Sequence, residues 1–220
     1  MLAVGPESDN SELMDLLSRN LEMPLAGVLG ADTGVDAAVK NLRLPESSFA
    51  MDSREDLFDL NLEELIEPSG MTGPGIVVRL AQPADEDLLT AWRVAYRIEV
   101  LGGESGEALE KEVRESVVAG TKEGIWGVME KDAEPVSMTG FNARVPGTVQ
   151  VGGVYTPPEQ RSRGYARIAV AASLKASRED GYRNSMLFTG HDQHAAQKVY
   201  RALGYQVIGG FRLLVMKTED

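Results

Sequence analysis

Residues 149–166 read VQVGGVYTPPEQRSRGYA and contain the pattern that decides the fold. The first seven residues are rich in β-branched side chains, which is typical of a strand, and Pro157 and Pro158 end it. A short loop then leads to Gly164, where we expect a helix to begin. The first amide groups of a helix have no partner within it and carry partial positive charge. The pattern therefore predicts a site for an anion such as a pyrophosphate.

Basic side chains accompany this loop. Arg161, Arg163 and Arg167 lie in it or directly after it, and residues 160–183 hold six basic and two acidic side chains. Two better-known phosphate motifs do not fit. No Gly-Lys-Ser/Thr follows the loop, and the glycine pair at 152–153 lies inside the strand rather than in a Gly-x-Gly-x-x-Gly turn after it.

Strand and helix patterns alternate along the chain after residue 75. Apolar residues at helical spacing predict helices, and β-branched or alternating runs predict strands. The expected strands are 76–80, 125–130, 135–144, 148–155, 185–189 and one or two within 205–216, and the expected helices are 84–100, 107–119, 164–180 and 193–203. This order predicts an α/β (α+β) fold with helices on the faces of a sheet.

The loop and the last expected helix together resemble the GNAT (GCN5-related) N-acetyltransferase family. The acetyl-CoA signature of that family is Arg/Gln-x-x-Gly-x-Gly/Ala after a strand that ends in a proline turn, and residues 161–166 match it as RSRGYA. The family then has an Asn-x-x-Ala-x-x-x-Tyr helix followed by Gly-Phe. Here residues 193–200 read QHAAQKVY, with Gln193 in place of Asn, and Tyr205 stands in place of Phe. The resemblance covers residues 76–220 and implies a mixed central sheet flanked by helices.

The resemblance implies direct transfer of an acetyl group from acetyl-CoA, the cosubstrate, to an amine. Backbone groups of Val154, Tyr155 and Thr156 would hold the pantetheine arm and polarise the acetyl carbonyl. The residues that the resemblance assigns to acetyl-CoA binding are these three together with Arg161, Ser162, Arg163, Gly164, Tyr165, Ala166 and Gln193.

The same resemblance implies a tyrosine that protonates the departing thiolate and a base that takes the proton of the amine. We assign the acid to Tyr200. The alternative is an ordinary half-buried tyrosine, because Tyr200 belongs to an apolar stripe of its helix. Glu99, Glu159 and His191 are the candidate bases, and each could equally be a solvated surface side chain.

Acidic residues are concentrated in the first third of the chain. The 220 residues carry a formal net charge of −12, with 15 acidic and 4 basic side chains in residues 1–70 against 19 and 18 in residues 71–220. The acidity argues against nucleic acid as a partner. A run rich in Pro and Gly predicts a linker at 71–75. We therefore expect an acidic N-terminal extension or remnant half domain over 1–70 and an acetyltransferase domain over 76–220.

The extension is expected to be mostly helical. Leu13, Leu16, Leu17 and Leu21 have helical spacing, and the leucines of residues 57–66 suggest a second amphipathic segment.

The residue types that the chain lacks exclude several chemistries. It has no cysteine and two histidines, so thiolate catalysis and disulfides are excluded and a metal site is not expected. We see no signal peptide and no apolar run of about 20 residues, and we therefore expect a cytoplasmic protein that does not enter a membrane.

Two functions fit these patterns. The first is an N-acetyltransferase that acts on a primary amine of a small molecule or peptide, and the second is a non-catalytic acyl-CoA-binding or regulatory module on the same fold. The sequence names neither the acceptor nor the assembly state, for which a homodimer is one option.

Overall fold

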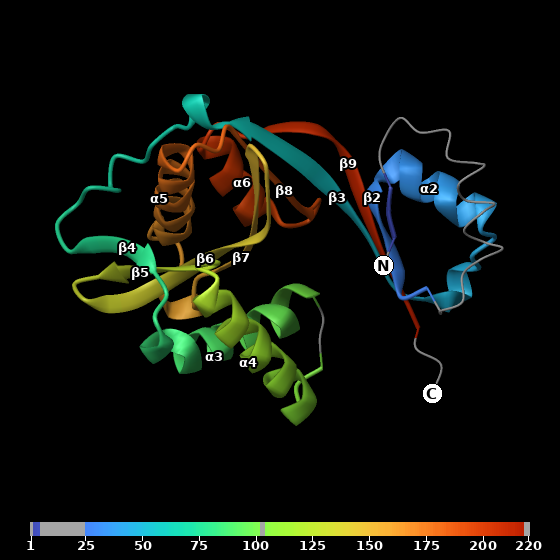
Figure 1. Cartoon of the computed structure of the whole chain (residues 1–220), viewed down its shortest axis with the longest axis horizontal. Helices are drawn as coiled ribbons and strands as arrows, with labels where there is room; N and C mark the ends of the chain where they lie inside the picture. Colours follow the sequence, from blue (N-terminus) through green and yellow to red (C-terminus); the bar gives the residue numbers. More distant parts are fainter. Residues whose placement is uncertain (1, 5–24, 102–103, 218–220) are drawn as a thin grey trace. The chain divides into compact units, whose positions relative to one another are not determined.

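The computed structural model describes residues 2–4, 25–101 and 104–217 (Figure 1). The chain divides into two compact units. The first unit comprises Met1–Phe58, Phe188–Gln197 and Val207–Asp220, and the second comprises Asp59–Leu187 and Lys198–Gln206. The chain passes between the units within three strands and one helix, so neither unit is a continuous segment.

The second unit contains a mixed sheet with the strand order β8-β7-β6-β5-β4. Neighbouring strands are antiparallel except for β7 and β8, which pair in parallel. The strands are β4 (Ile76–Leu80), β5 (Trp126–Lys131), β6 (Glu134–Val145), β7 (Thr148–Tyr155) and β8 (Asn184–Gly190). Burial alternates residue by residue along β7, as expected where one side of a strand faces a core.

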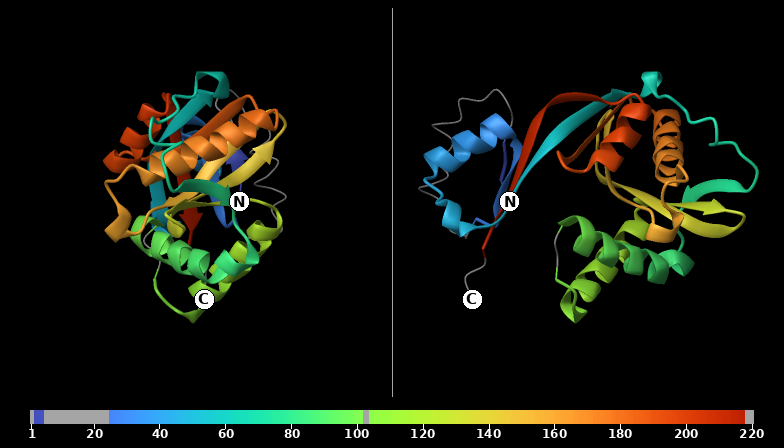
Figure 2. Two further views of the ribbon diagram at one scale, coloured as in Figure 1. Left: turned by 90° about the vertical axis from the view of Figure 1, so that its left-hand side faces the viewer. Right: turned by 180° about the vertical axis from the view of Figure 1, so that it is seen from behind.

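Helices cover both faces of this sheet (Figures 1 and 2). The helical segments are α3 (Glu86–Leu101), α4 (Glu107–Lys122), α5 (Tyr165–Glu179), α6 (His194–Ala202), η2 (Leu62–Glu64), η3 (Pro83–Asp85) and η4 (Pro158–Gln160). Val128 of β5 packs in a core with Leu89 of α3 and Val117 of α4. The next residue, Met129, packs with Ile168 of α5. Because successive side chains of a strand point to opposite faces, α3 and α4 cover one face of the sheet and α5 covers the other.

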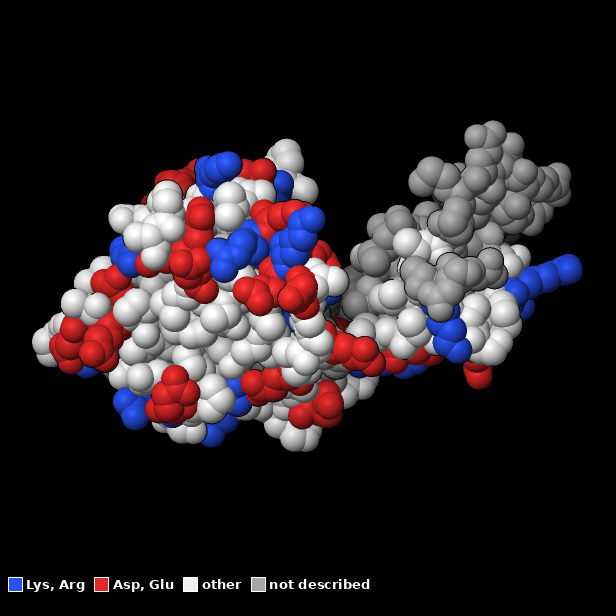
Figure 3. Space-filling model, turned by 90° about the horizontal axis from the view of Figure 1, so that it is seen from below, with Lys and Arg blue, Asp and Glu red and all other residues white. Residues whose placement is uncertain are grey.

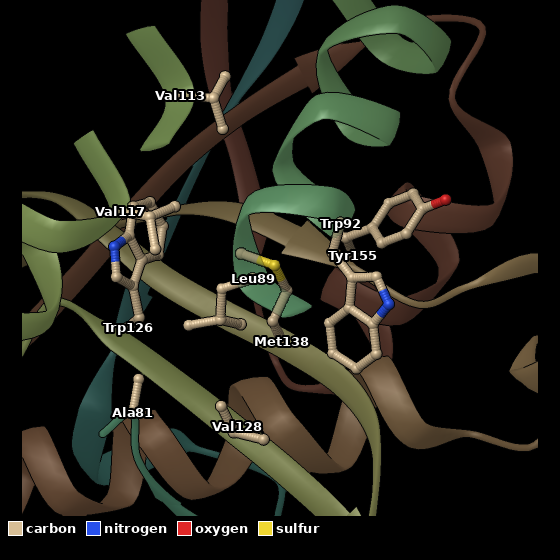
Figure 4. Packing of buried hydrophobic residues seen from close by; sticks show 9 residues of the cluster. All are labelled: Ala81, Leu89, Trp92, Val113, Val117, Trp126, Val128, Met138 and Tyr155. Atoms are coloured by element: carbon tan, nitrogen blue, oxygen red, sulfur yellow. The ribbon is translucent and has the colours of Figure 1, made fainter. Parts of the chain in front are cut away.

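Trp126, the first residue of β5, packs directly against glycine backbone. A Cβ atom on Gly120 of α4 would lie 2.4 Å from the indole Nε1, and one on Gly140 of β6 would lie 2.4 Å from Cε3. A Cβ atom on Gly153 of β7 would lie 3.1 Å from Cζ3. Figure 4 shows the indole among the other buried side chains of this core. The ring therefore fills the space that side chains at these three positions would need.

The first unit joins segments that are far apart in the sequence. Its strand order is β1-β2-β9-β3, with β1 parallel and β9 antiparallel to β2. Its elements are β1 (Leu2–Val4), β2 (Gly27–Ala31), α2 (Asp32–Asn41), η1 (Glu46–Ser48), β3 (Phe49–Asn61) and β9 (Gln206–Met216). Val35 and Ala38 of α2 pack with Val28 of β2 and Leu214 of β9 to form a small core.

A buried arginine neutralises part of the acidic extension. Arg212 of β9 is 8% exposed and donates two hydrogen bonds to the carboxylate of Asp52, at 2.8 and 2.6 Å, and one to Asp36. The guanidinium holds the pKa of Asp52 below its usual value. Asp52 and Asp36 thus supply negative charge to a buried guanidinium that would otherwise be unpaired.

The structure confirms the elements expected between residues 76 and 216, including the strand at Thr148–Tyr155. It differs within the extension, where residues 57–61 continue β3 instead of forming a helix. Every second residue of β3 is better buried from Phe49 to Glu55, and again at Phe58 and Leu60, which is the period of a strand. The described part of residues 1–70 therefore contains strands as well as α2.

Two other expectations for the extension are not decided by these elements. The helix expected around Leu13–Leu21 lies outside the described residues. The compact units follow contacts and not a single point in the sequence, so the functional division at 71–75 stays a prediction. None of the described helices is long and apolar enough to cross a membrane.

We expect Gly140→Ala to lower the free energy of unfolding by about 1–3 kcal/mol, because the added methyl group would overlap the indole of Trp126. Urea denaturation measures the change. Gly209→Ala is the matched control, because a Cβ atom there meets no atom within 4 Å, and its effect should stay within about 0.5 kcal/mol. Equal stability of the two variants would contradict the packing described here.

Candidate functional site

The loop between β7 and α5 has the backbone shape of an anion site. Ser162 and Gly164 have positive φ angles of 63° and 80°, and α5 has no acidic residue in its first turn. The first hydrogen bond of the helix joins the amide of Ile168 to the carbonyl of Gly164, at 3.1 Å. The amides of residues 165–167 therefore have no partner within the helix.

Gly164 sets this shape and leaves room in front of it. Its backbone conformation is one that favours glycine, and a Cβ atom there would meet no atom within 4 Å. In the first turn of α5, the Nε atom of Arg167 is buried and has no hydrogen-bond partner among the described residues. Unpaired amides and open space at Gly164 fit the pyrophosphate of acetyl-CoA.

The edge of β7 next to this loop is unpaired on one side. The two parallel strands pair over Thr148–Gln150 and Asn184–Met186, and the described residues show no pairing of Val151–Tyr155 with β8. Against β6, the register slips between Tyr155 and Gly152, which places a bulge at Gly153, with a φ angle of 62°. Backbone groups near the end of β7 are thus available to a ligand on the β8 side.

The three β7 residues expected to hold the pantetheine arm have different surroundings. Val154 and Thr156 are half-buried, whereas Tyr155 is buried in the core under α3 and α4. The carbonyl of Tyr155 accepts a hydrogen bond from the Ser137 hydroxyl at 3.0 Å, and that of Thr156 accepts one from Arg161 Nε at 2.9 Å. The side chain of Tyr155 is therefore part of the core, and these two carbonyl groups already have partners within the chain.

Arg161 and Glu99, expected to bind acetyl-CoA and to act as a base, form an ion pair. Arg161 Nη2 donates to Glu99 Oε2 at 2.7 Å, and the guanidinium lies over the ring of Tyr155, 5.6 Å from its centroid. The hydrogen bond from Arg161 holds the pKa of Glu99 below its usual value. A carboxylate with a lowered pKa accepts a proton less readily, so this pair weakens Glu99 as a general base.

The other residues of the loop are exposed or half-buried. Ser162 and Arg163 are exposed, Tyr165 and Ala166 are half-buried, and Arg163 Nη1 donates to the Gln160 side chain at 3.2 Å. Glu159 is exposed in η4.

Tyr200 of α6 is buried, with 9% of its surface exposed. Its ring meets that of Tyr205 edge to face, with the centroids 5.9 Å apart. Burial raises the pKa of the Tyr200 phenol, and the Tyr96 hydroxyl of α3 raises it further. The phenol is therefore neutral at working pH and a weaker acid than a free tyrosine.

His191 and Gln193 belong to the first unit, whereas Tyr200 belongs to the second. His191 is exposed, and its Nε2 atom lies 3.3 Å from Oδ1 of Asp56. The amide of Gln193 donates to the carbonyl of Gly190 at 3.0 Å, directly before α6 begins. These two expected site residues thus belong to one compact unit, whereas the loop, Glu99 and Tyr200 belong to the other.

Arg93 of α3 is the residue that the sequence did not single out. Its guanidinium lies over the rings of Trp126 and Tyr96, 4.9 and 5.1 Å from their centroids. A Cβ atom on Gly153 would lie 2.6 Å from Arg93 Nη1, so this cation touches the bulge of β7. No local pattern marks it, because its neighbours come from three separate elements.

Charges on the face of the second unit formed by α3 and α4 are mixed (Figure 3). Acidic and basic side chains both occur there, with uncharged surface between them. A hollow of about 430 Å³ on α4, lined by residues from Arg114 to Glu123, contains none of the residues discussed above. Among the described residues, no group of three or more His, Asp or Glu side chains could hold a metal ion.

Comparisons with known proteins agree with this geometry. The sequence model of the Acetyltransferase (GNAT) family matches residues 86–205, which is more than half of the chain. The chain therefore belongs to the GNAT family, whose fold supports acetyl transfer from acetyl-CoA in general.

Solved structures share the fold at low sequence identity. A GCN5-related N-acetyltransferase from Kribbella flavida is 18% identical, with a TM-score of 0.60 over 88% of this chain and 68% of that one. A GNAT acetyltransferase from Colwellia psychrerythraea is 13% identical, with a TM-score of 0.60 over 94% and 72%. One from Sphaerobacter thermophilus is 17% identical, with a TM-score of 0.58 over 88% and 61%. No curated protein matches the chain.

We expect Gly164→Asp to abolish acetyl-CoA binding and Gly164→Asn to weaken it much less. Both side chains tolerate a positive φ angle and have nearly the same size, so their difference reports the negative charge at the pyrophosphate site. Isothermal titration calorimetry with acetyl-CoA measures both affinities. Equal affinities would place the pyrophosphate elsewhere.

We expect Glu99→Gln to keep most of the turnover and to leave acetyl-CoA affinity unchanged or higher, because it frees the charge of Arg161. Both partners are more than 40% exposed, so the loss of the pair should cost about 0.2–1 kcal/mol of stability. Steady-state kinetics and calorimetry provide the measurements, with Glu112→Gln as the control, because Glu112 is also an exposed carboxylate paired with an arginine. A 100-fold loss of kcat at unchanged acetyl-CoA affinity would instead identify Glu99 as the base.

Proposed function

We propose that this protein transfers the acetyl group of acetyl-CoA directly to a primary amine of a small molecule or peptide. The observation that supports this most strongly is the pairing of two features in one segment. An unpaired, bulged edge of β7 leads directly into a loop whose amides and open space suit a pyrophosphate. An extended ligand with a pyrophosphate at one end and a thioester at the other matches that arrangement.

The proposed reaction balances without a further reactant. The neutral amine nitrogen attacks the thioester carbonyl carbon, so a C–N bond forms and the C–S bond breaks. The amine loses one proton, and the sulfur gains one, which gives an N-acetyl product and free CoA thiol. Holding the two reactants together supplies much of the rate.

The anion-binding loop positions the cosubstrate. The amides of residues 165–167 would receive the pyrophosphate. Arg163 adds an exposed positive charge, while Arg161 is already engaged by Glu99 and by the carbonyl of Thr156. Backbone amides near Val154 would hold the pantetheine arm and stabilise negative charge on the carbonyl oxygen.

Tyr200 would act on the sulfur. A neutral phenol donates a hydrogen bond to the departing thiolate, whose own pKa is about 8.5. Because burial raises the pKa of Tyr200, full proton transfer from it to sulfur is uphill. The hydrogen bond is therefore the larger part of its contribution.

The base must remove a proton from an amine with a pKa near about 10. Glu99 is weakened by Arg161, and Glu159 and His191 remain as candidates. The imidazole of His191 lies beside the carboxylate of Asp56.

A thiol-release assay across amino acids, amino sugars, polyamines and a lysine-containing peptide tests the proposal, together with calorimetry for acetyl-CoA. We expect binding, and thiol release that depends on one class of amine. Tyr200→Phe should lower kcat by about 100-fold with acetyl-CoA affinity unchanged, and Tyr182→Phe is the matched control.

Each contrary result has a definite meaning. Binding of acetyl-CoA without amine-dependent thiol release would favour the non-catalytic acyl-CoA-binding module. Absence of acetyl-CoA binding would contradict both the acetyltransferase and the acyl-CoA-binding module. Full turnover by Tyr200→Phe would remove the assignment of Tyr200 alone.

A further inference from the structure

We propose that Arg93 binds an anionic group, of the carboxylate class, on the acceptor amine. The inference rests on the proposed function, because it names the chemical class of the acceptor for that reaction. It concerns a residue outside the pyrophosphate loop, on the helix that covers the opposite face of the sheet from α5.

Arg93 is held in place by two aromatic rings and no acidic group. Trp126 and Tyr96 contact its guanidinium through cation–π interactions. Among the described residues it has no hydrogen bond and no ion pair. The side chain is half-buried, so its position is fixed while its donors have no acceptor.

Three other arginines of the second unit are paired with carboxylates. Arg79 donates to both Asp85 and Glu130, Arg97 to Glu112 and Arg161 to Glu99. Arg93 differs from these three, because the described residues place no carboxylate beside its guanidinium. Burial also lowers the pKa of Arg93, a cost of desolvation that a bound anion would offset.

The position of Arg93 points to the acceptor and not to the pyrophosphate. Its Nη1 atom contacts the bulge at Gly153, two residues before the end of β7, whereas the pyrophosphate loop is centred on Gly164. Tyr96, which holds one side of Arg93, also acts electrostatically on Tyr200. Arg93 therefore lies on the side of the site where the bond to the amine would form.

The donors of a guanidinium match a carboxylate in geometry. Its N–H groups form a planar fork that binds both carboxylate oxygens. A substrate with an amine and a carboxylate, such as an amino acid, would place its amine at the thioester and its carboxylate on Arg93.

The test compares L-alanine, L-glutamate and L-lysine with their amides and with the corresponding decarboxylated amines. We expect the wild-type protein to favour the carboxylate form by about 10-fold or more in kcat/KM. Arg93→Met should raise KM for the carboxylate form by about 10- to 100-fold, with kcat and acetyl-CoA affinity unchanged. Arg93→Lys should restore part of the loss, because it keeps the charge.

Arg97→Met is the matched control, because Arg97 lies one turn later on the same helix and is paired with Glu112. It should change none of these constants. Thermal unfolding of each variant shows whether it is folded. If Arg93→Met does not fold, the comparison of wild type with Arg93→Lys still tests the inference.

Equilibrium binding separates this inference from the proposed function. The same amino acids are titrated into CoA-saturated wild type and Arg93→Met by calorimetry, without turnover. Binding that depends on both the carboxylate and Arg93 supports the inference even if no amine is acetylated. Equal binding of carboxylate and amide would overturn it, as would an Arg93→Met variant that weakens all acceptors, or acetyl-CoA itself, alike.

Discussion

The indole of Trp126 is the constraint on which the second unit depends. It is surrounded by the backbone of α4, β6 and β7 at three glycines, so these elements can approach only where no side chain intervenes. Gly153 meets this requirement and also adopts the positive φ angle of the bulge. The packing of one core residue therefore fixes the shape of the β7 edge beside which acetyl-CoA is proposed to lie.

The same indole contacts Arg93, and the proposed site would thus combine two different ways of binding negative charge. At α5, positive charge would come from unpaired amides and the helix dipole, and the first turn of this helix has no acidic residue that would neutralise it. At α3, it would come from Arg93, whose guanidinium lies over two aromatic rings and has no acidic partner among the described residues. The net charge of −12 therefore does not describe the surroundings of either group, and Arg212 shows that some of the acidity is paired within the first unit.

The sequence was a good guide where neighbours in the chain are also neighbours in space. The strand, proline turn and glycine before α5 were all predicted, because φ angles and unpaired amides depend on local residues. Strand β3 was not predicted, because charged residues such as Asp52 interrupt the alternation of apolar and polar side chains that marks a strand. Asp52 has its partner, Arg212, on the distant strand β9. The ion pair of Arg161 with Glu99 and the isolation of Arg93 share this limit, since each depends on residues more than 30 positions away in the sequence.

The pairing of β2 with β9, where Gly27 lies opposite Val215, has a consequence for the order of folding. Strands β4 to β7 have partners nearby in the chain, apart from the helices α3 and α4 between β4 and β5. By contrast, the antiparallel partner of β2 lies almost 190 residues later in the chain, and distant contacts form late because a long loop must close first. During synthesis, which proceeds from the N-terminus, the segments that form the acetyl-CoA loop are complete before β2 can find its antiparallel partner. The acidic first third is therefore made first, and its antiparallel pairing with β9 forms last.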